Sequence, residues 1–158
     1  MKEINRREML AALSALAAAG CISAEADGQA LPSEKVLSKS MTWTFDSLPV
    51  KHNPNGGASR AVVQGALATG EAVEVHETML PPGQMPHPPH KHRHSEFMFI
   101  REGELEFDND GTKEKVGPGG VVFAASNVMH GLKNVGSAPA NYFVIAIGRE
   151  SAMTPVAK

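Results

Sequence analysis

The sequence predicts an all-β protein of the sandwich or jelly-roll type. Its 158 residues fit one domain, and they include 15 glycines and 11 prolines, a composition that supplies many turns. Short segments of alternating apolar and polar residues lie between those turns, as expected for half-buried strands. After residue 40, no segment shows the apolar period of a helix.

The individual strands follow from this alternation. Residues 71–79 alternate clearly, and the Pro-Pro-Gly run at 81–83 ends the segment. The run Asn-Asp-Gly at 109–111 predicts a tight hairpin, because Asp-Gly tolerates the positive φ angles that such turns require. Further strands are expected over residues 96–100, 104–107, 121–123, 130–135 and 142–147.

The first residues are expected to be an export signal rather than part of the fold. An apolar run over residues 9–19 follows Arg6 and Arg7, and its eleven residues are too few to span a bilayer, which needs about 20. The arginine pair resembles a twin-arginine signal, which exports folded proteins to a periplasmic or secreted location. We therefore divide the chain into a signal peptide (1–26), a linker or N-terminal arm with a possible strand (27–58), a β-barrel (59–148) and a tail (149–158).

Two alternatives remain for this N-terminal region. Residues 18–21 resemble a lipobox ending at Cys21, and lipidation there would anchor the mature protein to a membrane. The region could also form an ordinary amphipathic first helix, although its apolar run shows no polar stripe.

Charge and cysteine content exclude two classes of function. Lys and Arg number 15 against 17 Asp and Glu, a net charge of -2, so the basic surface needed to bind nucleic acid is not expected. A single Cys allows neither an intramolecular disulfide nor a Cys-rich zinc site.

A histidine cluster carries the chemistry that the sequence suggests. Four of the seven histidines lie between residues 87 and 94. On a strand, His90 and His92 share one face, about 6.6 Å apart, and so can converge on one metal ion. Glu96 has the same parity but lies about 13 Å farther along a straight strand, so a bulge or sharp bend is expected between His92 and Glu96. With His130 as a fourth donor, this set suits Mn, Fe, Ni, Cu or Zn.

The other histidines receive different interpretations. His94 is a candidate acid or base if it points inward, and His87, set among prolines, is expected at the rim of the site. His52 is expected in a solvated loop. His76 lies opposite Val73, Val75 and Met79 in the alternation, so we expect it to face outward. A surface histidine tract that collects metal without a defined site is the alternative to an ordered centre.

Two spaced motifs resemble those of the cupin family. The first contains Gly83, His90, His92, Glu96 and Gly103, with six residues in the first gap where the family has about five. The second contains Gly119, His130 and Asn134, with Ala125 and Asn127 at positions where the family has Pro and Gly. Asn tolerates a left-handed backbone nearly as Gly does, so the turn at Asn127 is expected to be kept. A register that uses His92 and His94 instead would misplace Glu96.

The resemblance implies a cupin double-stranded β-helix, a jelly-roll barrel with one divalent transition metal ion inside. It implies His90, His92, Glu96 and His130 as ligands, and a homodimer, as cupins often are. Alternation from Glu96 makes Met98, Ile100, Leu105 and Phe107 candidates for contacting a small-molecule substrate in the barrel.

The activity remains open, because cupins include oxygenases, decarboxylases, isomerases, epimerases and binding proteins. By analogy with the family, we place a dioxygenase-like oxidoreductase acting on a small chelating molecule first. The alternatives are a non-catalytic cupin that binds a small molecule or metal, and a cupin isomerase or decarboxylase. Fe or Mn is favoured, since a barrel exported folded would take its metal in the cytoplasm, before Zn or Cu competes; Zn, Ni or Cu stay possible.

Overall fold

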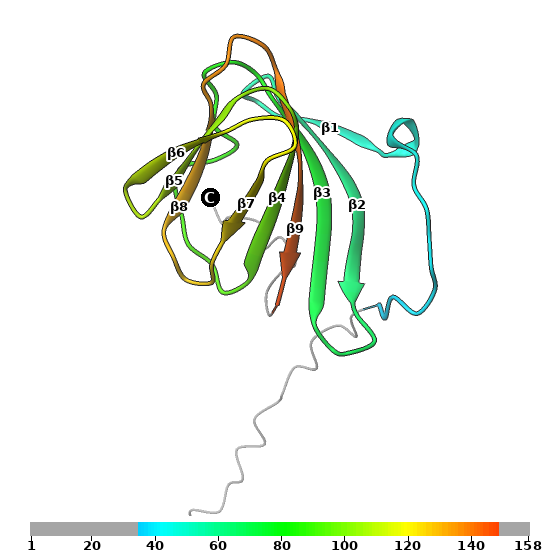
Figure 1. Cartoon of the computed structure of the whole chain (residues 1–158). Coiled ribbons are helices and arrows are strands. Elements are labelled where there is room, and N and C mark those ends of the chain that lie inside the picture. The colour runs from blue at the N-terminus through cyan, green and yellow to red at the C-terminus, as the bar shows by residue number, and fades with distance from the viewer. Residues whose placement is uncertain (1–34, 149–158) are drawn as a thin grey trace, which may run out of the picture. The chain divides into compact units, whose positions relative to one another are not determined.

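The computed structural model describes residues 35–148 (Figure 1). The predicted signal peptide, the lipidation candidate Cys21, the first part of the predicted arm and the C-terminal tail lie outside the described residues. Within the described residues, no helix is long and apolar enough to cross a membrane.

Two antiparallel sheets make up the described part of the chain, and Figure 1 shows them on opposite sides of the barrel. The larger sheet has six strands in the order β1-β2-β3-β9-β4-β7, and the smaller has three in the order β6-β5-β8. The elements in chain order are the 3-10 turn η1 (Phe45–Ser47), β1 (Val50–His52), β2 (Ala58–Ala66), β3 (Ala72–Leu80), β4 (Ser95–Glu102), β5 (Leu105–Asn109), β6 (Thr112–Val116), β7 (Val121–Ala124), β8 (His130–Asn134) and β9 (Ala140–Ile147). This arrangement confirms the all-β jelly-roll prediction.

The core lies between the two sheets and is formed by every second residue of the strands. Strands β3, β4, β7 and β9 of the large sheet contribute to it, and β5 and β8 supply the opposite wall. The buried cluster consists of Leu80, Met98, Ile100, Leu105, Phe107, Val122, Ala124, Leu132, Ala140, Tyr142 and Val144. All but Tyr142 are apolar, so burial of this inner face is the main stabilising contribution to the fold.

The predicted hairpin is present and joins β5 to β6. Asp110 and Gly111 both have positive φ angles, of 50° and 88°, as the sequence predicts for this turn. Strand β6 has five residues, of which four are exposed, and so lacks the apolar signal from which the other strands were predicted. Strand β2 also follows no simple alternation, because its register shifts at a bulge between Ala61 and Val63.

The expectation that His76 faces outward is wrong. The inner face of β3 contains Leu80, a member of the core, and strict alternation places His76 on that same face. The opposite set misled the prediction because it is apolar too: Val73 is buried on the outer side. There the segment before the barrel packs on the sheet, with the Lys35 carbonyl and the Leu37 side chain covering Gly65 in the neighbouring strand β2.

Candidate metal centre

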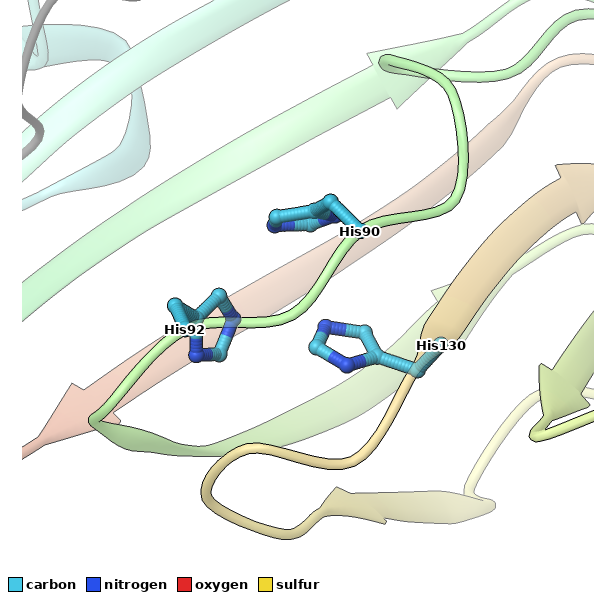
Figure 2. Close-up of side chains that lie close together, drawn as sticks. All are labelled: His90, His92 and His130. Atoms are coloured by element: carbon cyan, nitrogen blue, oxygen red, sulfur yellow. The ribbon is translucent and has the colours of Figure 1, made fainter.

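Three histidines from two separate segments point toward one another at one end of the barrel (Figure 2). His90 and His92 lie in the loop between β3 and β4, and His130 begins β8. The backbones of His90 and His130 form a pair of hydrogen bonds, each 2.9 Å, which hold the loop against β8. The loop and the small sheet therefore supply ligands to a common point.

The candidate ligand atoms lie close enough to share one ion. Those of His90, His92 and His130 all lie within 4.8 Å of one another. Glu96, on the inner face of β4, adds a carboxylate: its Oε1 is 3.3 Å from Nε2 of His92, and its Oε2 is 3.6 Å from Nε2 of His130. The structure thus brings together the four residues that the sequence singled out as ligands.

The sharp bend that the sequence required between His92 and Glu96 is present. Residues 93 and 94 form a bend, and the strand begins only at Ser95. The bend stacks the His94 ring on that of His92, with the centroids 3.5 Å apart, and places Nε2 of His94 3.1 Å from Oε1 of Glu96. His94 therefore points toward the site and contacts two predicted ligands, and a second set of three donors consists of His92, His94 and Glu96. Its role as a catalytic acid or base remains a prediction.

The donor set fits a metal ion. The described residues contain four buried side-chain nitrogen or oxygen atoms that have no hydrogen-bond partner, and three of them belong to the cluster: Nδ1 of His90, Nε2 of His92 and Nε2 of His130. An unpaired polar atom in a protein interior is costly unless a ligand or ion satisfies it. Three such nitrogens around one point, with a carboxylate beside them, match the preference of divalent transition metals.

Backbone carbonyls orient two of these rings. Nδ1 of His130 lies 2.9 Å from the carbonyl of Val128, and Nδ1 of His92 lies 2.9 Å from the carbonyl of His94. A carbonyl can only accept, so each Nδ1 donates its proton and each Nε2 keeps a lone pair for a metal. This is the usual outer-sphere arrangement around a metal-binding histidine.

The electrostatics of the cluster also favour metal binding. Burial, reinforced by repulsion from neighbouring imidazoles, lowers the pKa of His90 to about 4, and burial also lowers the pKa of His92. Burial opposes ionisation of Glu96, but the hydrogen bonds and charges of the surrounding histidines outweigh it and hold the pKa of this carboxyl well below its usual range. At His130 burial acts to lower the pKa, but attraction to Glu96 raises it. At neutral pH the site therefore presents unprotonated His90 and His92 beside an ionised carboxylate.

The motif residues outside the donor set hold the turns and strand ends of the barrel. Gly103 has a φ of 85°, and a Cβ there would lie 2.6 Å from Ala140, so the tight turn after β4 requires glycine. Asn127 has a φ of 59°, which confirms that Asn keeps the left-handed turn before β8. Asn134 is fully buried, and its amide donates to the carbonyls of Leu80 and Ala138.

The predicted substrate-contacting residues all point into the barrel. Met98, Ile100, Leu105 and Phe107 belong to the buried core, and each is at most 5% exposed. Their contact with a substrate remains a prediction. The ring of His87 lies edge-on to that of His90 with centroids 4.1 Å apart, and His87 also lines a surface hollow formed with residues 53–55 and 83–89. This position agrees with the expectation that His87 lies at the rim.

Sequence reasoning missed one polar pair inside the barrel. Glu74 is buried, and both of its carboxylate oxygens lie within 3.0 Å of Nδ1 of His76. Glu74, His76 and Leu80 are separated by even numbers of residues on one strand, so alternation from Leu80 could have placed both polar residues on the inner face.

The fold and the site together define a β-barrel with a three-histidine, one-glutamate donor set at one end. Residues 76–146, which contain both motifs and all four donors, match the model of the cupin domain. Residues 76–146 of the protein are therefore a cupin domain, as the motif spacing predicted.

Solved structures with this fold have diverse descriptions. An RmlC-like cupin from Shewanella frigidimarina NCIMB 400 is 18% identical, with a TM-score of 0.59 over 71% of this chain and 95% of that chain. A predicted oxalate decarboxylase from Thermotoga maritima is 20% identical, with a TM-score of 0.56 over 68% and 99%. The polyketide cyclase RemF from Streptomyces resistomycificus is 16% identical, with a TM-score of 0.55 over 69% and 80%.

At these identities the neighbours establish the fold alone. Comparison with curated proteins finds no significant match.

Proposed function

We propose that this cupin is a metal-dependent enzyme acting on a small molecule that chelates the metal, with a dioxygenase-like oxidation as the first choice of reaction. The observation that carries the proposal is the group of three buried, unpaired imidazole nitrogens beside the carboxylate of Glu96. Fe or Mn is the favoured ion, with Zn, Ni or Cu as alternatives.

The chain's own groups define what the site can do. When bound, a transition metal would supply Lewis acidity or a route for electrons between a chelating substrate and dioxygen. His90, His92, His130 and Glu96 would hold it, and the Glu96 carboxylate would offset one unit of its positive charge. The bend at residues 93 and 94 holds His94 against Glu96 and His92, where it can orient both. The apolar residues deeper in the barrel exclude water from the opposite side of the site.

A non-catalytic binding protein is the second candidate, because the packing of the barrel limits the site to holding a small ligand. The predicted substrate-contacting residues are nearly inaccessible, and Leu105 is fully buried. A ligand is therefore restricted to the metal end of the interior. Such a site suits a small chelating metabolite whether or not it reacts.

Metal analysis separates these candidates. The untagged protein is purified from its own compartment beside a His90→Ala/His130→Ala variant, and both are analysed for elements. About one Fe or Mn per chain, lost in the variant, supports the dioxygenase-like proposal, and oxygen uptake is then measured with catechols and β-diketones. Zn or Ni at that ratio would favour isomerase, decarboxylase or binding roles, and a wild-type protein without metal would contradict the enzyme proposal.

We further propose that residues 1–26 direct export to a periplasmic or secreted location through the twin-arginine route. Support comes from Arg6 and Arg7 before a short apolar run. Fusing residues 1–30 to a reporter, with and without both arginines changed to lysine, tests the route. Undiminished export of the changed fusion would contradict it, and labelling with fatty acid at Cys21 would show that the mature protein is lipid-anchored instead.

We also propose a homodimer formed through the outer face of β4 and β7. Phe97 pairs with Phe123 and Phe99 with Val121 across these strands, and all four side chains are exposed. A patch of this kind marks an association surface, and it carries no charge that would repel a second copy. Light scattering should report a dimer for the wild type and a monomer for Phe99→Asp/Phe123→Asp; a monomeric wild type would contradict the proposal.

A further inference from the structure

The inner wall of the barrel carries a second group of titratable side chains, separate from the metal ligands. Glu74 and His76 lie two residues apart on β3, so their side chains share the inner face. Oε1 and Oε2 of Glu74 lie 3.0 and 2.8 Å from Nδ1 of His76. The Glu74 side chain is 8% exposed and that of His76 is 22% exposed, so the ion pair is shielded from bulk solvent on the carboxylate side.

The carboxylate determines which nitrogen of His76 carries the proton. An ionised carboxylate can only accept hydrogen bonds, so Nδ1 of His76 donates and Nε2 keeps its lone pair. Among the described residues no group hydrogen-bonds to this Nε2, and it is not one of the fully buried unpaired atoms. It therefore faces accessible space with its lone pair unoccupied.

The strand register places this pair beside the metal centre. Glu74 is paired with Ala146 of β9, and Ala146 is paired in turn with Glu96 of β4. Two strand spacings, about 10 Å, thus separate the backbones of Glu74 and Glu96 in one row. The intervening side chain in that row is only the methyl group of Ala146, and His76 lies in the adjacent row, paired with Val144.

The neighbouring strands place no charged side chain directly beside Glu74 and His76 on this face. The residues paired beside it are uncharged: the exposed Ala61 and Gln64 on β2, and the buried Val144 and Ala146 on β9. The other titratable groups that share this interior are Glu96, the imidazoles of the metal centre and the buried phenol of Tyr142, which is paired with Thr78 of β3. His94 differs from His76, because its Nε2 already contacts the Glu96 carboxylate and its ring stacks on His92.

We propose that Glu74 and His76 form a carboxylate–imidazole pair that takes a proton from a chelating phenol or enol bound at the metal centre. The O–H bond of the ligand breaks, its electron pair stays on the ligand oxygen, and the proton forms an N–H bond at Nε2 of His76. Glu74 then faces the resulting imidazolium and stabilises it. This inference rests on the proposed metal function and assigns it a residue that accepts the proton.

The test uses 4-nitrocatechol, whose visible spectrum reports its ionisation, with the full-length protein loaded with Zn²⁺, which is colourless and redox-inert. The pH at which the bound probe loses its second proton is compared among wild type, His76→Gln and Glu74→Gln. We expect a midpoint about one pH unit higher in His76→Gln, which corresponds to about a tenfold change in the equilibrium. Glu74→Gln should raise it as well, since an amide can donate to Nδ1 and move the imidazole proton to Nε2.

Two controls make the outcomes distinct. His52→Gln makes the same substitution at an exposed histidine of β1 and should leave the midpoint unchanged. Zn²⁺ content should be equal in all four proteins, because neither member of the pair is a proposed ligand. If Zn²⁺ and the probe bind but the midpoints of wild type and His76→Gln coincide, the inference is wrong while the metal function stands.

Nitrogen NMR of the metal-free protein tests the pair without any metal. The His76 signals should show a protonated Nδ1 and an unprotonated Nε2 in the wild type, and the reverse in Glu74→Gln. A proton on Nε2 in the wild type would overturn the inference. A wild type that takes up no Zn²⁺ would instead contradict the metal function on which it rests.

Discussion

The same strands line both ends of the barrel interior, but the side chains that they place at the two ends differ. At one end β4 contributes Glu96 and β8 contributes His130, both in the metal centre; toward the other end the same strands contribute Ile100 and Leu132 to the core. All four side chains point inward by alternation. Parity therefore decides whether a residue faces the interior, and its position along the strand decides whether it joins the candidate donor cluster or the apolar core.

The two ends also differ in how they are constructed. The apolar end is built from regular strands whose side chains fill the space between the sheets. The metal end depends on irregular backbone, with a bend at residues 93 and 94 and a left-handed turn at Asn127. Substitutions at the metal end should therefore lower metal affinity, and substitutions at the apolar end should lower the free energy of unfolding.

The largest effect is expected at the metal end. His92→Ala removes one of the three buried donors and should lower metal affinity by more than about 100-fold, since even outer-sphere changes cost about 10- to 100-fold. Competition with a chromophoric chelator measures this affinity. His52→Ala is the matched control and should bind metal as the wild type does; equal affinity in His92→Ala would exclude His92 as a ligand.

A comparable loss of stability, without loss of the site, is expected at the apolar end. Leu105 is fully buried, and Leu105→Ala should lower the free energy of unfolding by about 3 kcal/mol through lost burial and the cavity left behind. Urea denaturation followed by circular dichroism gives this number. The folded variant should still bind one metal ion, and a variant that is stable but metal-free would show that the two ends are coupled.

A smaller loss is expected at Asn134, whose amide joins the ends of β3 and β8 to the segment before β9. Asn134→Ala leaves the carbonyls of Leu80 and Ala138 and the amide of Gly136 without their buried partner. We expect about 2 kcal/mol of destabilisation, because each buried group left unpaired is costly. Asn141→Ala serves as the control, since its amide bonds an exposed Glu102 carboxylate; an equal loss there would refute the argument from burial.

The smallest effect is expected from acid on the metal-free protein. The pKa of His90 is lowered to about 4 in the folded state and is about 6.5 when unfolded, so the unfolded chain binds a proton first as pH falls. This contribution to stability is present above pH 6.5 and is lost as pH falls from 6.5 to 4. Because the ring is partly exposed, and because the raised pKa of His130 opposes the effect, we expect about 1 kcal/mol.

Urea denaturation of the metal-free protein at pH 7 and pH 5 measures this change. His90→Asn should lose less stability over that interval than the wild type. An equal or greater loss in the variant would show that another group carries the acid sensitivity.

The metal end proved more predictable from sequence than the outer surface of the sheet. The spacing of His90, His92, Glu96 and His130 is a local pattern with a chemical requirement, and the required bend followed from strand length alone. His76 was misplaced because β3 has two buried faces, and alternation of apolar residues does not say which face is inside. That ambiguity was resolved only by the packing of distant residues, such as Lys35 over Gly65.

The backbone pairing of His90 with His130 has a consequence for how the folded protein resists proteolysis. These residues lie 40 positions apart, so an ion bound to both would act as a removable cross-link in a chain whose single Cys cannot form an internal disulfide. Ligand binding at 100 times its dissociation constant stabilises a folded protein by about 2.7 kcal/mol. Resistance to proteolysis would therefore follow the supply of metal in the protein's surroundings.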